Sequence, residues 1–205
     1  MLYIAELTEI KLSVGVTDTD DDAKITLLAE LLQGRFDDHT NRGLLLSSAI
    51  VELHDGGFRS LLLRNFPTVS ITDIRVDGDG IFEAETALDS DSFRFDPERG
   101  RVVRGIGNRV WEQGFKNVQV TYTGGFVAQG TSPGAGETAM PEGLRRAFLM
   151  QIEFEWRNKS RLGTQQVNAA GQTVNFGNPS VTRSLKNQTF MPEVETSLLE
   201  YVRKE

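Results

Sequence analysis

The stretch "VGVTDTDDDAKITLLAELLQGRFDDHTNRG", residues 14–43, carries the clearest structural pattern in this 205-residue chain. It opens with four aspartates: Asp18, Asp20, Asp21 and Asp22. Apolar residues then recur at helical spacing: Ile25, Leu28, Leu32 and Phe36, with Leu31 beside them. This period predicts an amphipathic helix over about residues 20–40. Carboxylates in a first turn favour the positive end of the helix dipole, and Thr19 or Asp18 is expected to cap the helix.

The alternating spacing of Asp18, Asp20 and Asp22 also resembles half of a calcium-binding loop. Such a loop needs glycine at its sixth position and glutamate at its twelfth, and here these positions hold Ala23 and Ala29. The aspartates are therefore interpreted as a solvated helix start. We expect no metal site and no cofactor.

The residues around this helix predict the other elements. "AELTEIKLSVG" indicates a short first helix that ends at Gly15. From residue 49 to 126, short apolar runs alternate with turn signals such as "DGDG", "DPERG" and "YTGG", which predicts an antiparallel β module. A helix over 141–158 follows, opened by Pro141, with an apolar face at helical spacing: Leu144, Phe148, Ile152 and Trp156. We expect this face to pack against the apolar face of the helix over 20–40.

Residues 159–190 are polar and rich in Asn, Gln and Gly, with hairpin signals around 169–171. Pro192 then opens a final helix. Its apolar stripe has no expected partner within the chain: Val194, Leu198, Tyr201 and Val202, widened by Leu199. The predicted fold is α+β, a small helical bundle with an inserted antiparallel β module and an extended C-terminal arm ending in a short helix. The predicted parts are a body over 1–158 (helices over 1–42 and 141–158, β module 49–126) and an arm over 159–205.

Composition excludes several classes of function. The absence of cysteine rules out disulfides, thiolate zinc sites and a cysteine nucleophile. The net charge is −7, of which −6 falls in residues 1–41, whereas proteins that grip nucleic acid need clustered Lys and Arg. The first residues form no export signal and no stretch has transmembrane length, so we expect synthesis in the cytoplasm and no membrane partner. His39 and His54 match no catalytic motif, so we expect no enzyme activity.

The order of the pieces adds further information. The segments are "TDTDDDAKITLLAELLQGRFDDHTNR", "LLLRNFPTVSITDIRVDG", "NVQVTYTGGF", "PEGLRRAFLMQIEFEWRNKS" and "MPEVETSLLEYVRK". In this order they resemble the head–tail connector (adaptor) proteins of tailed bacteriophages, over nearly the whole chain. This chain departs from the pattern of that family in two places: the long 159–190 segment and the "PGAG" loop at residues 133–136.

The resemblance implies a structural protein without catalytic residues. Copies would form a ring, usually a dodecamer, beneath the portal of the capsid in the neck of the virion, made in the cytoplasm of a bacterial host. The ring would join the capsid to the tail, contact a downstream neck or tail protein and let double-stranded DNA pass without specific binding. The C-terminal stripe would dock onto the portal. The aspartates 18, 20, 21 and 22 would face either the channel, where they would repel DNA phosphates, or the outside.

Two alternatives remain open at the level of sequence. One is another neck protein, a stopper or tail-terminator ring, which would be mostly a β-barrel without the leading helices. The other is a small soluble hydrolase that uses carboxylates. A deep pocket with converging polar groups would favour the hydrolase.

Overall fold

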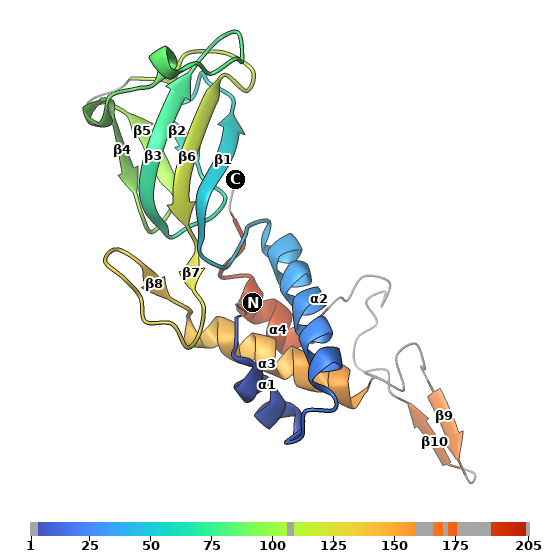
Figure 1. Cartoon of the computed structure of the whole chain (residues 1–205). Helices are drawn as coiled ribbons and strands as arrows, with labels where there is room; N and C mark the ends of the chain where they lie inside the picture. Colours follow the sequence, from blue (N-terminus) through green and yellow to red (C-terminus); the bar gives the residue numbers. More distant parts are fainter. Residues whose placement is uncertain (1–3, 106–108, 159–165, 170–171, 176–189, 204–205) are drawn as a thin grey trace.

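The structure is a computed structural model, and it describes residues 4–105, 109–158, 166–169, 172–175 and 190–203. A layer of helices and a β module lie end to end (Figure 1). The helices are α1 (Leu7–Val14), α2 (Asp22–Thr40), α3 (Glu142–Arg157) and α4 (Pro192–Leu198). The chain therefore leaves the helical layer after α2 and returns to it at α3, as the sequence predicts. The α+β fold class is confirmed.

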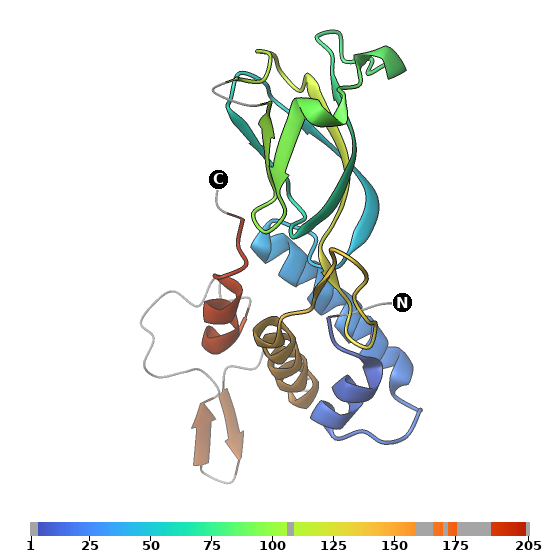
Figure 2. The ribbon, with the colours of Figure 1, turned by 90° about the vertical axis from the view of Figure 1, so that its left-hand side faces the viewer.

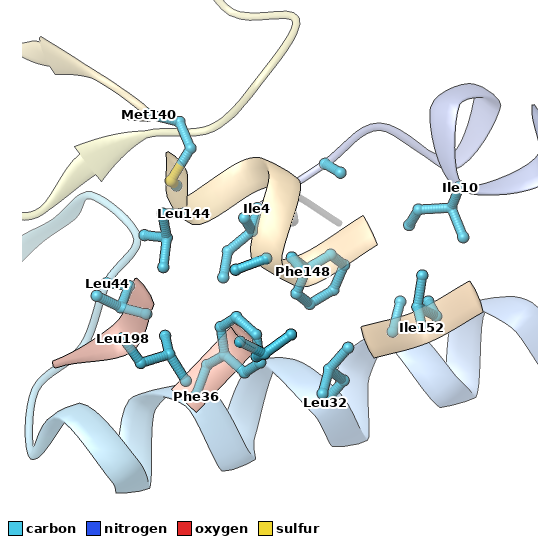
Figure 3. Close-up of a cluster of buried hydrophobic side chains, with 14 of the residues drawn as sticks. Ile4, Ile10, Leu32, Phe36, Leu44, Met140, Leu144, Phe148, Ile152 and Leu198 are labelled. Atoms are coloured by element: carbon cyan, nitrogen blue, oxygen red, sulfur yellow. The ribbon is translucent and has the colours of Figure 1, made fainter. Parts of the chain in front are cut away.

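The helical layer encloses its own apolar core. Phe36 of α2 meets Phe148 of α3 edge to face, with ring centroids 5.5 Å apart. Ile25 and Leu32 of α2 and Ile152 of α3 are also fully buried in this cluster. The predicted packing of these two faces is confirmed (Figure 3). The same core takes up Ile4 and Ile10 from the N-terminal segment, and Leu198 from α4.

The ends of the first two helices follow from local chemistry. α1 ends at Gly15 in the left-handed conformation (φ 74°), where glycine has no Cβ to clash. α2 begins at Asp22, with Asp21 as its N-cap and no side-chain capping hydrogen bond. The expectation that Thr19 or Asp18 caps α2 is therefore wrong. The chain instead makes a turn there, in which the Asp22 N–H donates to the Thr19 carbonyl oxygen at 3.2 Å.

The β module consists of two small antiparallel sheets. One has the order β1-β6-β3 and the other β2-β5-β4. The strands are β1 (Ser47–His54), β2 (Ser60–Leu62), β3 (Thr68–Val76), β4 (Phe93–Asp96), β5 (Arg101–Arg104) and β6 (Val118–Gly124), with single 3₁₀ turns at Ala84–Thr86 and Ser90–Ser92. Ile74, Val102, Trp111 and Val120 are buried in one cluster between the sheets. This second core makes the β module a packed unit beside the helices.

The remaining elements are short. β7 (Phe126–Val127) and β8 (Thr138–Ala139) pair in parallel on the path from β6 to α3. β9 (Gln166–Ala169) and β10 (Gln172–Asn175) pair antiparallel, which confirms the predicted hairpin around 169–171. The division of the chain into a body and an arm at residue 158 stays a prediction.

Candidate functional site

The junction between the two layers is built around the buried Arg42, just after α2. Its guanidinium lies over the ring of Phe66 at 3.6 Å and donates a hydrogen bond to the Phe66 carbonyl oxygen. Burial lowers the pKa of Arg42 to about 10, although the nearby Asp37 favours its charged form. Burial likewise raises the pKa of Asp37, whose carboxylate accepts the Leu44 N–H at 3.0 Å. These contacts fix the exit of the chain from α2 into β1.

The C-terminal segment crosses the same junction. Tyr201 meets Phe126 edge to face at 6.3 Å. The Arg203 N–H donates to the Thr40 carbonyl oxygen at 3.1 Å, at the end of α2. In Figure 2 this segment rises from α4 beside the helical layer towards the β module. The end of the chain therefore connects both layers.

The predicted portal-docking stripe is divided by this packing. Val194 and Leu198 are fully buried in the core of the helical layer. The premise that the stripe lacks a partner within its own chain is therefore wrong, because α2 and α3 together leave a space that α4 fills. Leu199 remains 58% exposed, and Tyr201 and Val202 are half-buried. The docking role itself stays a prediction, and the exposed members are the ones available for it.

The four aspartates lie at the end of α2 remote from the β module (Figure 1). Asp22 pairs with Lys11 of α1 at 2.6 Å, and Asp21 pairs with Lys24 at 2.6 Å. Asp18 and Asp20 are exposed, and Asp18 Oδ1 accepts the Asp20 N–H at 3.2 Å. Two of the four carboxylates are thus paired with lysines, while two face solvent. Within the described ranges, no group of three or more His, Asp or Glu side chains is arranged to hold a metal ion.

The densest group of polar side chains surrounds Glu52 of β1. Its carboxylate accepts the hydroxyl of Tyr122 and the Arg64 N–H at 3.0 Å, and lies 3.2 Å from Nε2 of His54. Burial acts to raise the pKa of Glu52, but hydrogen bonds from His54 and Tyr122 outweigh it and hold the pKa below its usual range. Tyr122 also accepts the Asn65 N–H at 2.9 Å. The group joins β1, β6 and the segment after β2.

A hollow of about 420 Å³ lies beside Glu52. Its described lining residues are Asp37, Asp38, Asn41, Arg42, Gly43, Ile50, Val51, Glu52, Arg64 and Asn65. Its carboxylates are Asp37, Asp38 and Glu52, and two of these are engaged within the chain: Asp37 accepts the Leu44 N–H and Glu52 accepts the Tyr122 hydroxyl. The Glu52 carboxylate already accepts hydrogen bonds from its own chain. This arrangement fits a residue that links neighbouring strands better than a residue of a hydrolase site. His39, in the last turn of α2, is not among the described lining residues and lies edge to face with Phe190 at 5.2 Å.

The structure also exposes apolar side chains that the sequence pattern did not separate from the core. Leu27 and Leu31 of α2 are 56% and 60% exposed, and Phe154 of α3 is 44% exposed. The sequence places Leu31 beside the apolar face, and its spacing from Leu27 puts both residues on the side of α2 that turns away from Leu32. No helix in the described part of the chain combines the length and the apolar character needed to cross a membrane.

Comparisons with known proteins give structural matches to chains of gene transfer agent particles. No protein-family model matches the chain, and no curated protein matches it. A chain in the neck of an empty gene transfer agent (GTA) particle, computed with C6 symmetry, shares 14% identity at a TM-score of 0.58, over 98% of this chain and 90% of that one. A chain in the neck of the native GTA particle, computed with C12 symmetry, shares 15% identity at a TM-score of 0.51, over 100% and 96%.

A third match comes from the virion of the native GTA particle, at 15% identity and a TM-score of 0.52, over 98% of this chain and 90% of that one. At such identities the likeness establishes a shared fold. It extends across both layers, because nearly the whole of each chain is covered.

Proposed function

We propose that this chain is a structural protein of the neck of a tailed phage-like particle. Copies would form a ring beneath the portal, join the capsid to the tail and leave a channel for double-stranded DNA. The observation that carries this proposal is the fold shared, over at least 98% of the chain, with chains from GTA necks computed with C6 and C12 symmetry. A dodecamer is the ring size that agrees with the C12 symmetry of one of these necks.

The geometry supports a scaffold in preference to an enzyme. The polar group at Glu52 is satisfied by Tyr122, His54 and the Arg64 N–H, and it ties strands together. The helical layer also disfavours a stopper or tail terminator, since such a ring is expected to be mostly β-barrel, whereas α1, α2, α3 and α4 here form a core of their own. The helical layer and the β module each have a packed core, yet apolar side chains such as Leu27 and Leu31 remain exposed. Contacts between copies in a ring would cover such side chains.

The portal contact is assigned to the exposed part of the C-terminal segment. Leu199 is exposed, and Val202 lines a hollow of about 420 Å³ together with Leu62, Phe66, Glu98, Arg99 and Glu200. An apolar portal segment seated there would contact Val202 and would have to extend beyond the hollow to reach Leu199 and Tyr201, while Val194 and Leu198 would support the contact from the core. The opposite end of the ring would contact the next neck or tail protein.

The test is assembly on heads that carry a portal but lack a neck. The purified chain is mixed with such heads, which are then sedimented and imaged by electron microscopy. We expect a ring with twelvefold symmetry below the portal. A chain that fails to sediment with the heads, or that binds the outer capsid surface, would contradict the proposal.

A further inference from the structure

One side of α2 forms a ridge that faces away from the helical core. Its exposed residues recur every three or four positions, which places them on one stripe of the helix. They are Ala23, Leu27, Leu31, Gly34 and Asp38, and they are called the α2 ridge below. Leu27 and Leu31, one turn apart, form its apolar centre.

The outer side of α3 forms a groove. A hollow of about 250 Å³ is lined by Met150, Glu153, Phe154, Arg157, Asn158 and Met191, called the α3 groove below. Met150 and Phe154 are one helical turn apart, as Leu27 and Leu31 are. The spacing of the apolar centre of the ridge thus matches that of the groove.

The ridge and the groove lie on opposite sides of the helical layer. α2 and α3 bury facing side chains, with Phe36 against Phe148, and the exposed Leu31 and Phe154 each lie on the side of their helix turned away from this contact. Met150 and Met191 of the groove are half-buried and also pack against the core. Neither surface can therefore reach the other within one copy. A ring built from identical subunits needs two different patches on each copy, facing in different directions.

The charges at the two surfaces are complementary. The α2 ridge ends at the exposed Asp38, and the exposed Asp20 precedes its other end. The outer side of α3 carries Arg146, which has no carboxylate partner among the described residues, and Arg157, which pairs with Glu153 at 2.7 Å. The acidic ends of the ridge are thus complementary to Arg146, whereas Arg157 is already neutralised within the chain by Glu153.

Gly34 adds an independent indication of a close neighbour. A Cβ at this position would meet no atom within 4 Å in its own chain. Glycine in a helix interior costs about 1 kcal/mol relative to alanine, so packing within the chain does not account for it. The open space at this turn leaves room for the surface of another chain to approach closely.

We propose that the α2 ridge of one copy seats in the α3 groove of the next copy, and that this contact, repeated, closes the ring. The proposal rests on the proposed function, since it names the surfaces by which the neck ring is held together. It makes the contact heterologous: each copy uses its ridge towards one neighbour and its groove towards the other.

The test uses the absence of cysteine from the chain, so that introduced thiols have no background. The full chain carrying Leu31→Cys and Phe154→Cys together is bound to portal-bearing heads, treated with a flexible bismaleimide and run on a denaturing gel. We expect a ladder of cross-linked species up to the complete ring. Each single variant should give no dimer, and an equal mixture of the two should give dimers but no ladder.

The control pair is Ile81→Cys with Phe154→Cys, since Ile81 is exposed, as Leu31 is, but belongs to the β module. A ladder from this pair, or a dimer from Leu31→Cys alone, would overturn the proposed contact. The proposed contact would also be overturned if the chain carrying Leu31→Cys and Phe154→Cys sediments with the heads but gives no ladder. Failure of the unmodified chain to sediment with the heads would instead overturn the proposed function.

Discussion

The guanidinium of Arg203 donates a hydrogen bond to the carbonyl oxygen of Leu62 at 2.8 Å, so the C-terminal segment is tied to the β module. The backbone N–H of the same residue bonds to the end of α2. Together with the burial of Val194 and Leu198, these contacts make the C-terminus part of the folded body. Any docking function of this segment therefore acts from a surface that the core already holds in place.

The first prediction concerns the stability of that body. Leu198→Ala should lower the free energy of unfolding by about 2–5 kcal/mol, because it removes a fully buried side chain and leaves a cavity beside Phe36 and Phe148. The matched control, Leu199→Ala, should change it by no more than about 0.5 kcal/mol, because Leu199 is exposed. Urea denaturation followed by circular dichroism measures both. Equal effects of the two variants would contradict the burial of α4.

The second prediction separates docking from folding. Leu199→Asp should abolish sedimentation with portal-bearing heads while leaving the urea midpoint nearly unchanged, because it places a charge on an exposed apolar contact. Glu193→Ala, an exposed position on α4, should leave both properties unchanged. If Leu199→Asp binds the heads as well as the unmodified chain does, the portal contact lies on another surface.

The third prediction concerns pH. The pKa of Glu52 is lower in the folded chain than the ordinary glutamate value of 4.5, so its carboxylate stabilises the fold above that value. This contribution is lost as the pH falls through the folded pKa. Glu52→Gln should therefore cost about 1–3 kcal/mol at pH 7, and less in acid. Urea midpoints of both proteins between pH 7 and pH 3 should converge, and a constant difference would argue against the carboxylate as the cause.

The fourth prediction concerns the junction. Arg42→Lys keeps the positive charge but loses the planar group that lies over Phe66 and bonds its carbonyl oxygen. We expect it to lower the free energy of unfolding by about 1–2 kcal/mol. Arg64→Lys, on the exposed surface nearby, is the matched control and should be near neutral. Equal urea midpoints of Arg42→Lys and the unmodified chain would contradict this role of the guanidinium.

Periodicity predicted the elements well where one helix or strand could be considered alone. The faces of α2 and α3 were identified from the spacing of Ile25, Leu32, Phe148 and Ile152, because a helix of that length must bury one stripe. The partner of α4 was not predictable in the same way. Its stripe is visible in the sequence, but the space it fills is formed by side chains more than 40 positions away, such as Phe36 and Phe148.

The candidate surfaces were less predictable for the same reason. Helical spacing leaves Leu27 outside the apolar face of α2, but the sequence does not show whether another element covers such a residue or leaves it exposed. β6 lies between β1 and β3 in its sheet, and it pairs with strands that are distant in the sequence. No local sequence pattern predicts such a pairing. The aspartates were recognised as a helix start, but their pairing with Lys11 and Lys24 depends on how α1 folds back and on the first turn of α2.

The last prediction concerns these aspartates in the assembled particle. Asp21 and Asp22 are each paired with a lysine, so Asp18 and Asp20 supply most of the uncompensated charge at this end of α2. If this end faces the channel, a ring repeats that charge around the path of the DNA, and its field is screened by salt. Replacing Asp18 and Asp20 together by Asn should slow DNA release from particles at low ionic strength, with little effect at high ionic strength. The matched variant, Asp21→Asn with Asp22→Asn, should slow release at least as much, because it changes the net charge equally and leaves Lys11 and Lys24 without their carboxylate partners. Fluorescence of a DNA-binding dye in the medium follows the release. A double variant at 18 and 20 that releases DNA at the unmodified rate under both conditions would place the aspartates on the outside of the ring.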